Sequence, residues 1–191
     1  MKIIFVTGAP GAGKTFISDY IVETMGKKEK VIQMGVDFIR DILRANINKD
    51  DNQELHASSL FQASEAHYRS QATTVIDKGI VPAVLRGIEE RRNMIFDGVN
   101  CVPSMLQEAF ADIETNVAKI VYIVITVPNV KNHLKQLELQ NDVDVEAKMG
   151  KIEKIRHMQD FLIADGESAG AHVLHNDDTI FERLKKIISE L

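Results

Sequence analysis

Short runs of consecutive apolar residues recur along the chain, and each is followed by a longer amphipathic stretch. The clearest runs are residues 3–6 and 120–125, in which every position is apolar. An apolar run without alternation is typical of a strand that is buried on both faces, as in the interior of a parallel sheet. The same reasoning predicts three further strands, at residues 30–35, 94–97 and 171–174.

The stretches between these runs carry apolar residues three and four positions apart, which is the spacing of one helix face. Helices are therefore predicted at residues 14–25, 37–46, 54–78 and 151–166, after Pro82, Pro103 and Pro128, and from Ile180 to the end. We expect Gly79 to stop the long helix. Strands that alternate with helices in this way predict an α/β fold, a five-stranded parallel sheet with helices on both faces. The whole chain, residues 1–191, is predicted to be one domain.

The most informative motif is at residues 8–15, which follow the first strand directly and match Gly-x-x-x-x-Gly-Lys-Thr. In such a phosphate-binding loop, backbone N–H groups surround a phosphate and the next helix adds the positive end of its dipole. The Lys14 ammonium would bind the β- and γ-phosphates, and the Thr15 hydroxyl would ligate Mg²⁺. The predicted nucleotide-binding residues are Gly8, Ala9, Pro10, Gly11, Ala12, Gly13, Lys14, Thr15 and Phe16.

Composition favours an ordinary globular enzyme. Apolar residues make up 45% and charged residues 27% of the 191 residues, and no apolar run approaches the ~20 residues of a membrane span. The only cysteine, Cys101, excludes an internal disulfide framework and favours a reducing cytoplasm; it is expected to be a packed residue. A net charge of −5 gives no overall attraction to nucleic acid, although a local basic cleft stays open.

In a doubly wound sheet the functional site lies at the carboxyl ends of the strands, and four acidic or basic residues are predicted there. Asp97 ends the third strand and could hold Mg²⁺ beside Thr15, or simply cap a turn before Gly98. Asp37 follows the second strand and could be the base that takes a proton from an acceptor hydroxyl, a helix N-cap, or both. Arg40 and Arg44 share its helical face and could bind an anionic acceptor. The opposite face is predicted to be buried and comprises Phe38, Ile39, Ile42 and Leu43.

The mixed-charge stretch at about 128–156 is predicted to be a helical lid that excludes water from the transferring phosphate. Kinase lids commonly bring arginines to the γ-phosphate, but no arginine occurs between Arg92 and Arg156. Either lysines of this stretch or Arg156 from the returning helix would therefore stabilise the transition state, and Arg156 is the favoured candidate. The histidines at 56, 67, 157, 172 and 175 show no clustering that would indicate a metal site.

These residues make the chain resemble the P-loop kinase family of 2-phosphoglycerate kinases. Residues 37–44, Asp-Phe-Ile-Arg-Asp-Ile-Leu-Arg, are similar to that family's Asp-x-Ile-Arg-x-x-Met-Arg segment. Residues 55–59 resemble its Leu-His-x-Ser-Ser segment, and residues 155–162 resemble its Ile-Arg-x-Ile-Gln-x-Tyr-Leu helix. The strand and lid entry at residues 124–127 and His133 also match. The resemblance covers most of a kinase domain and implies transfer of a phosphoryl group to a small phosphorylated metabolite.

The chain departs from that family where the acceptor would bind. Asp97-Gly98-Val99-Asn100 replaces the family's Glu-Gly-Val-His, so Asp97 and Asn100 are predicted substrate-facing residues. The Asp-x-x-Arg pair of Asp37 and Arg40 also resembles the kinase half of polynucleotide kinases. A nucleic-acid acceptor, either a 5′-hydroxyl or a hydroxymethylated base as in bacteriophage-type kinases, is therefore the alternative. It predicts a basic groove beside Arg40, formed by the arginines at 86, 91 and 92.

The sequence thus predicts an ATP-dependent kinase that uses Mg²⁺ and transfers the γ-phosphoryl group to an acceptor hydroxyl. A nucleotide-dependent switch is disfavoured, because the Lys-x-Asp run that selects guanine in many GTPases is absent after the fourth strand. Adenine is the predicted base, with residues 176–178 as the segment that could line its pocket. No acceptor identity and no oligomeric state follow from the sequence.

Overall fold

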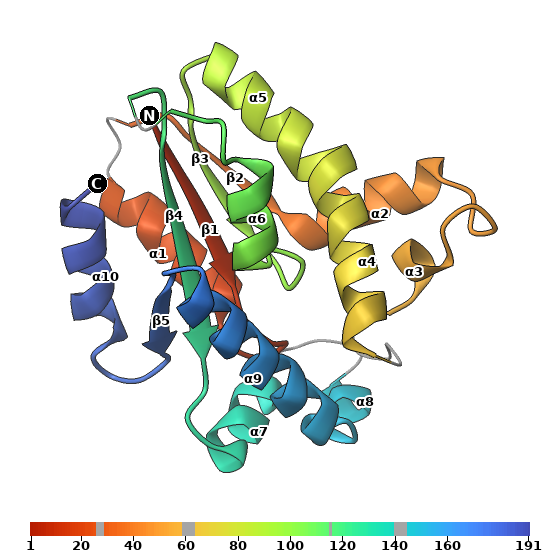
Figure 1. Ribbon diagram of the computed structural model, residues 1–191. Helices are drawn as coiled ribbons and strands as arrows, with labels where there is room; N and C mark the ends of the chain where they lie inside the picture. Colours follow the sequence, from red (N-terminus) through yellow and green to blue (C-terminus); the bar gives the residue numbers. More distant parts are fainter. Residues whose placement is uncertain (26–28, 59–63, 115, 140–144) are drawn as a thin grey trace.

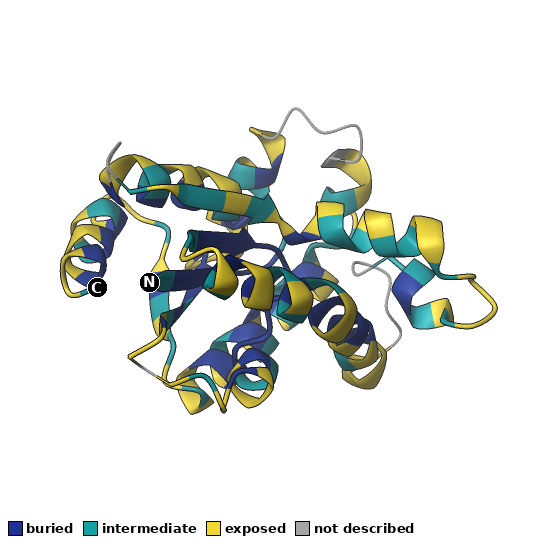
Figure 2. Cartoon of the chain, turned by 90° about the horizontal axis from the view of Figure 1, so that it is seen from above, coloured by how far each residue is buried: buried dark blue, intermediate teal, exposed yellow. Residues whose placement is uncertain are grey.

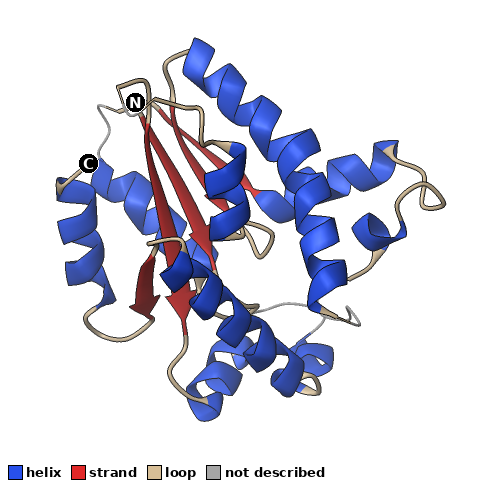
Figure 3. Cartoon of the chain, viewed as in Figure 1, coloured by secondary structure: helices blue, strands red, loops and turns tan. Residues whose placement is uncertain are grey.

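The computed structural model describes residues 1–25, 29–58, 64–114, 116–139 and 145–191. Its centre is a sheet of five parallel strands in the order β2-β3-β1-β4-β5 (Figures 1 and 3). The strands are β1 (Lys2–Thr7), β2 (Val31–Gly35), β3 (Asn93–Asp97), β4 (Lys119–Thr126) and β5 (His172–His175). The predicted all-parallel α/β fold is confirmed. Since β1 lies between β3 and β4, the segments after these three strands meet at one edge of the sheet.

Apolar side chains of the strands alternate between two cores, one on each face of the sheet. Ile4 and Val6 of β1 face α1 (Lys14–Met25) and α10 (Ile180–Ser189). Ile3 and Phe5 face the opposite way, toward α4 (Glu65–Val75), the π-helical turn η2 (Ile76–Ile80), α5 (Val81–Glu89) and α6 (Pro103–Ala109). Figure 2 shows the strands as the most buried layer between the two helical layers.

The remaining helices surround the carboxyl edge of the sheet. They are α2 (Val36–Asn46), α3 (Gln53–His56), α7 (Val130–Glu138), α8 (Val145–Met149) and α9 (Ile152–Ser168). Figure 1 shows α7, α8 and α9 below the strand ends, with α2 and α3 to one side. The long helix α9 returns over β4 and β5.

The predicted long helix at 54–78 begins nearly where expected, but it is interrupted after His56 and does not end at Gly79. Asn52 caps the short helix α3 through Leu55, and Ser64 separately caps α4 through His67. Gly79 does not stop the helix, because η2 continues directly into α5. The glycine serves packing instead: a Cβ at this position would lie 2.3 Å from Cγ2 of Ile39 on α2.

The predicted buried face of α2 is only half buried. Ile39 and Leu43 pack against the second core, as expected, but Phe38 and Ile42 are 71% and 50% exposed. The reason is topological, because α2 follows β2, which is an edge strand with one neighbour. A helix at the edge of a sheet has less apolar surface to cover than one over the centre.

No helix in the described part of the chain is both long and apolar enough to cross a membrane.

Candidate active site

The phosphate loop follows β1 and enters α1 in the predicted place. Gly8, Gly11 and Gly13 have φ angles of 155°, 81° and 90°, which only glycine adopts without strain. A Cβ at Gly8 would lie 2.4 Å from the carbonyl oxygen of Ile125, so the loop also sits tightly against β4. Thr15 and Phe16 are exposed at the start of α1. Backbone N–H groups of this first helical turn have no partner within the helix and can bind an anion.

Lys14 is folded back over the loop. Its Nζ donates a hydrogen bond to the carbonyl oxygen of Ala9 at 3.1 Å. Burial lowers the pKa of Lys14, while the negative charges of Asp37 and then Asp97 raise it. The lysine therefore lies within electrostatic reach of both predicted site carboxylates, one at the end of β3 and the other on α2 just after β2.

Two side chains that the sequence did not assign to the loop hold its carbonyl groups from outside. His133 on α7 contacts the carbonyl oxygen of Pro10 through Nε2 at 2.7 Å, and Asn176 donates through Nδ2 to the carbonyl oxygen of Ala12 at 2.9 Å. Leu137, one turn after His133, fills the space beside Gly11. No motif could have revealed these contacts, because they join residues more than 120 positions apart.

Asp97 is buried, with only 7% of its surface exposed. Burial raises the pKa of its carboxyl group, and a hydrogen bond from Gln33 and the charge of Lys14 lower it in part. A carboxylate that the protein solvates poorly gains most from a bound cation.

The donor set fits Mg²⁺. The carboxylate of Asp97 and the exposed hydroxyl of Thr15 are hard oxygen ligands, and Mg²⁺ normally takes one or two protein ligands together with phosphates and water. No group of three or more His, Cys, Asp or Glu side chains that could hold a metal ion occurs in the described ranges. Asp97 and Thr15 are thus the residues that would hold the ion beside a bound triphosphate.

Asp37 and Arg40 stand together on the first turns of α2. Arg40 Nη2 lies 3.1 Å from Asp37 Oδ1; the Arg40 side chain is 12% exposed and that of Asp37 is 60% exposed. The N-cap residue of α2 is Gly35, and no side chain caps this helix end, so Asp37 does not have the capping role considered for it. Burial lowers the pKa of Arg40, and the charge of Asp37 raises it. A largely desolvated guanidinium beside an exposed carboxylate is suited to bind an anion at its outer edge.

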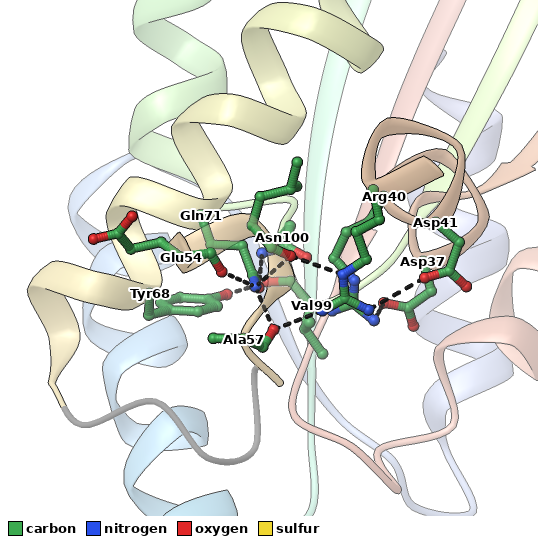
Figure 4. A network of polar contacts seen from close by, with 11 residues as sticks. Asp37, Arg40, Asp41, Glu54, Ala57, Tyr68, Gln71, Val99 and Asn100 are labelled. Atoms are coloured by element: carbon green, nitrogen blue, oxygen red, sulfur yellow. Dashed lines mark hydrogen bonds and ion pairs between the residues drawn. The ribbon is translucent and has the colours of Figure 1, made fainter. Parts of the chain in front are cut away.

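Arg44 and Asn100 belong to a polar network next to this pair. Figure 4 shows part of it, with Ala57, Gln71 and Asn100 labelled. Arg44 donates through Nε to the carbonyl of Leu55 at 2.8 Å and through Nη2 to that of Ala57 at 2.6 Å. Gln71 of α4 donates to the carbonyl of Ala57 as well, at 2.8 Å, and accepts from Nδ2 of the buried Asn100 at 3.2 Å. Arg44 thus links α2 to α3, and Asn100 links the segment after β3 to α4 through Gln71. The predicted role of Arg44 and Asn100 in substrate binding stays a prediction.

Arg156 lies on α9, near its beginning. Its Nη1 donates to the carbonyl oxygen of Val127 at 2.5 Å, just beyond the end of β4. The side chain of Gln159 also hydrogen-bonds Val127, accepting from its N–H at 2.8 Å and donating to its carbonyl at 3.1 Å. Residues 140–144 of the predicted lid lie outside the described residues, while α7 is packed on the phosphate loop through His133 and Leu137.

The arginines proposed for a nucleic-acid groove lie away from the site. Arg86 pairs with Glu89 and Glu90, and Arg92 pairs with Glu90. These residues end α5 and precede β3, so they lie at the amino edge of the sheet, roughly 15 Å of strand from the phosphate loop. The expected groove beside Arg40 is therefore not formed by these arginines.

Cys101 is fully buried near Asp97, and burial raises its pKa well above the ordinary value. It is a packed residue, as predicted.

The family model AAA_18, described as an AAA domain, matches residues 4–159, which include the phosphate loop, both site carboxylates and Arg156. The chain belongs to this family. A search of curated proteins gives no significant match.

Solved structures share the fold. A protein described as a putative kinase from Chloroflexus aurantiacus is 12% identical, with a TM-score of 0.51, and the match covers 99% of this chain and 92% of that one. A chain in the structure of a Pnkp1/Rnl/Hen1 complex is 19% identical, with a TM-score of 0.44; the match covers 74% of this chain and 40% of that longer one. The family and the fold together place this AAA_18 member in the P-loop kinase superfamily, a nucleotide-binding group.

Proposed function

We propose that this protein is an ATP-dependent kinase that phosphorylates a hydroxyl group of a small anionic metabolite, as the resemblance to 2-phosphoglycerate kinases implies. The observation that carries the proposal is the assembly at one sheet edge. There Lys14, Asp97 and Asp37 come from the segments after β1, β3 and β2, and both carboxylates act on the charge of Lys14. A triphosphate on the loop would have its γ-phosphate facing Asp37 and Arg40.

The proposed chemistry is an in-line transfer. The acceptor oxygen forms a bond to the γ-phosphorus while the bond from that phosphorus to the β–γ bridging oxygen breaks, and ADP leaves. Asp37, which is exposed and does not cap its helix, takes the proton from the acceptor hydroxyl. Lys14 and the loop N–H groups balance the charge on the phosphates, and Mg²⁺ held by Asp97 and Thr15 would supply further positive charge there.

Arg40 supports an anionic acceptor. Its guanidinium is held by Asp37 on one side and is largely removed from solvent, which strengthens a charge-assisted contact with a phosphate or carboxylate. Arg156, at the other side of the loop, is the proposed donor to the transferring phosphoryl group. It would have to leave the carbonyl of Val127 or share its donors with it.

The test is transfer of labelled γ-phosphate from Mg·ATP to a panel of acceptors: phosphorylated hydroxy acids including 2-phosphoglycerate, nucleosides, 5′-hydroxyl oligonucleotides and DNA with hydroxymethylated bases. We expect label on a small acid, loss of transfer in Lys14→Ala, and a fall of ~10²-fold or more in Asp37→Asn. Label on nucleic acid would overturn the acceptor class. Hydrolysis of ATP with no labelled acceptor, or unchanged turnover in Lys14→Ala, would contradict a kinase that uses this loop.

A further inference from the structure

The three glycines of the phosphate loop make its backbone flexible. Glycine loses more conformational freedom on folding than any other residue, so a loop with three glycines in eight positions only weakly fixes the orientation of its own peptide groups. Phosphate binding nevertheless requires that particular N–H groups face the ligand before it arrives. Something outside the loop must fix the peptide planes.

Two peptide planes of the loop are fixed by side chains. The carbonyl of Pro10 is held by Nε2 of His133, and that of Ala12 by Nδ2 of Asn176. In a trans peptide the C=O and the following N–H point in opposite directions, and the described chain has no cis peptide. Holding these carbonyls on the outside therefore turns the N–H groups of Gly11 and Gly13 toward the inside of the loop.

The two N–H groups so turned are available to a ligand. Within the described chain, neither Gly11 nor Gly13 donates its N–H to another backbone group. By contrast, the N–H of Ala12 is used inside the loop, on the carbonyl of Ala9 at 3.1 Å. The two peptide planes held by His133 and Asn176 thus carry N–H groups that remain for a phosphate, in addition to those of the first turn of α1.

The residues that hold the loop are themselves anchored at the end of β4. The N–H of Asn176 donates to the carbonyl of Thr126 at 2.8 Å. His133 lies six residues after Val127, whose N–H and carbonyl are both hydrogen-bonded to the side chain of Gln159. Between them, Asn129 caps the start of α7. Both supports therefore rest on the same strand end.

His133 is built as a neutral donor. Its side chain is fully buried; burial lowers its pKa, the Pro10 hydrogen bond raises it, and the charges of Arg156 and Lys14 lower it. A neutral imidazole carries one N–H, and the carbonyl of Pro10 requires it on Nε2. No titration is needed for this role.

We propose that His133 and Asn176 are positioning residues of the nucleotide site, which orient the N–H groups of Gly11 and Gly13 toward the phosphates of a bound nucleoside triphosphate. This rests on the proposed binding of ATP. It also gives α7 a role as a wall of the phosphate loop, in addition to its place at the start of the predicted lid.

The test compares variants that keep or remove the donor. His133→Leu keeps bulk without an N–H, and His133→Gln places an amide N–H near the position of Nε2. Asn176→Leu removes the second donor. His157→Leu, an exposed histidine of α9, is the matched control. Affinities for Mg·ATP, inorganic tripolyphosphate and adenosine are measured by titration calorimetry, together with the melting temperature without ligand.

We expect His133→Leu and Asn176→Leu each to weaken Mg·ATP and tripolyphosphate binding by about fivefold or more, with adenosine affinity unchanged, and His133→Gln to restore most of the loss. Unchanged tripolyphosphate affinity in both Leu variants would overturn the inference. So would a folded His133→Gln that binds as weakly as His133→Leu. Absence of Mg·ATP binding by the unsubstituted chain would overturn the proposed function itself, whereas a wrong acceptor class would leave these binding results unaffected.

Discussion

At the scale of single residues, the site combines groups whose local environments oppose their charge. Asp97 and Lys14 both lie where burial disfavours ionisation, and each partly offsets the cost for the other. Such an arrangement is costly for folding and useful for binding, because a bound cation or phosphate supplies the charge that the protein withholds.

Asp97→Asn should therefore separate stability from function. A raised pKa means that the ionised carboxylate is less favourable in the folded than in the unfolded chain. Removing its charge should raise the melting temperature of the nucleotide-free protein by roughly 2–4 °C, equivalent to about 1 kcal/mol. Phosphoryl transfer should fall on the order of 10²-fold, because the Mg²⁺ ligand is lost.

The control is Asp19→Asn, an exposed carboxylate on α1 that accepts a hydrogen bond from Gln33 at 2.7 Å. It should change neither property appreciably. A lower melting temperature in Asp97→Asn would show that the carboxylate stabilises the fold, which contradicts the direction of its pKa.

At the scale of elements, the position of the proposed acceptor-binding residues depends on how α2 packs against its neighbours. This helix carries Asp37 and Arg40; it packs through Val36, Ile39 and Leu43 on the second core and is tied to α3 through Arg44. Arg44 and Gln71 of α4 both donate to the backbone carbonyl of Ala57, and Arg44 also donates to that of Leu55, so these side chains hold α3 beside α2. A small displacement of α2 would move the acceptor groups relative to the phosphate loop.

Gly79→Ala tests how the packing of α2 against η2 affects acceptor binding. The new Cβ would lie 2.3 Å from Cγ2 of Ile39, so α2 or η2 must shift. Overpacking of this kind should destabilise the protein by roughly 1–3 kcal/mol, reduced by the better helix propensity of alanine, as measured by denaturant unfolding. The KM for the acceptor should rise more than the KM for ATP, because the phosphate loop belongs to other elements.

Gly35→Ala is the matched control, since a Cβ at that position meets nothing within 4 Å and its φ of −70° suits alanine. Equal changes of both KM values in Gly79→Ala would indicate a general loss of structure in place of a displaced α2.

At the scale of the whole molecule, the two layers of helices leave the carboxyl edge of the sheet as the place where all site segments meet. His133 is the group there whose protonation couples the site to global stability. It faces Arg156 of α9 and Lys14 of α1, which both lower its pKa further, and it contacts the carbonyl of Pro10.

The sign of this coupling follows from the lowered pKa. In the unfolded chain the imidazole binds a proton near pH 6.5, whereas in the folded protein it does so only at lower pH. The free energy of unfolding is therefore unaffected above that range and falls as the pH drops below ~6.5, by up to about 1 kcal/mol per pH unit, until the folded pKa is reached.

His133→Gln keeps the donor and removes the titration. Thermal denaturation at pH 7.5, 6.5 and 5.5 should show a smaller loss of stability for the variant than for the unsubstituted protein. Parallel pH dependences would mean that the native environment of His133 does not favour the neutral ring.

The sequence by itself determined the sheet, because apolar runs and the phosphate-loop motif depend only on neighbours along the chain. The strands β4 (Lys119–Thr126) and β3 (Asn93–Asp97) were predicted nearly to the residue. Lys14, Asp97 and Asp37 could be assigned to one edge because each ends or follows a parallel strand. The solvent-facing Phe38, the packing role of Gly79 and the hydrogen bonds of Arg44 could not be predicted. They depend on which strand is at the edge and which helix lies against it.

The supports of the phosphate loop depended on tertiary structure most completely. His133 and Asn176 meet the loop only because β4 and the segment after β5 end beside it. The motif specifies which peptide groups can bind phosphate, since that follows from glycine and chain geometry. Their orientation is set by side chains more than 120 residues away, because a flexible loop takes its conformation from whatever packs against it.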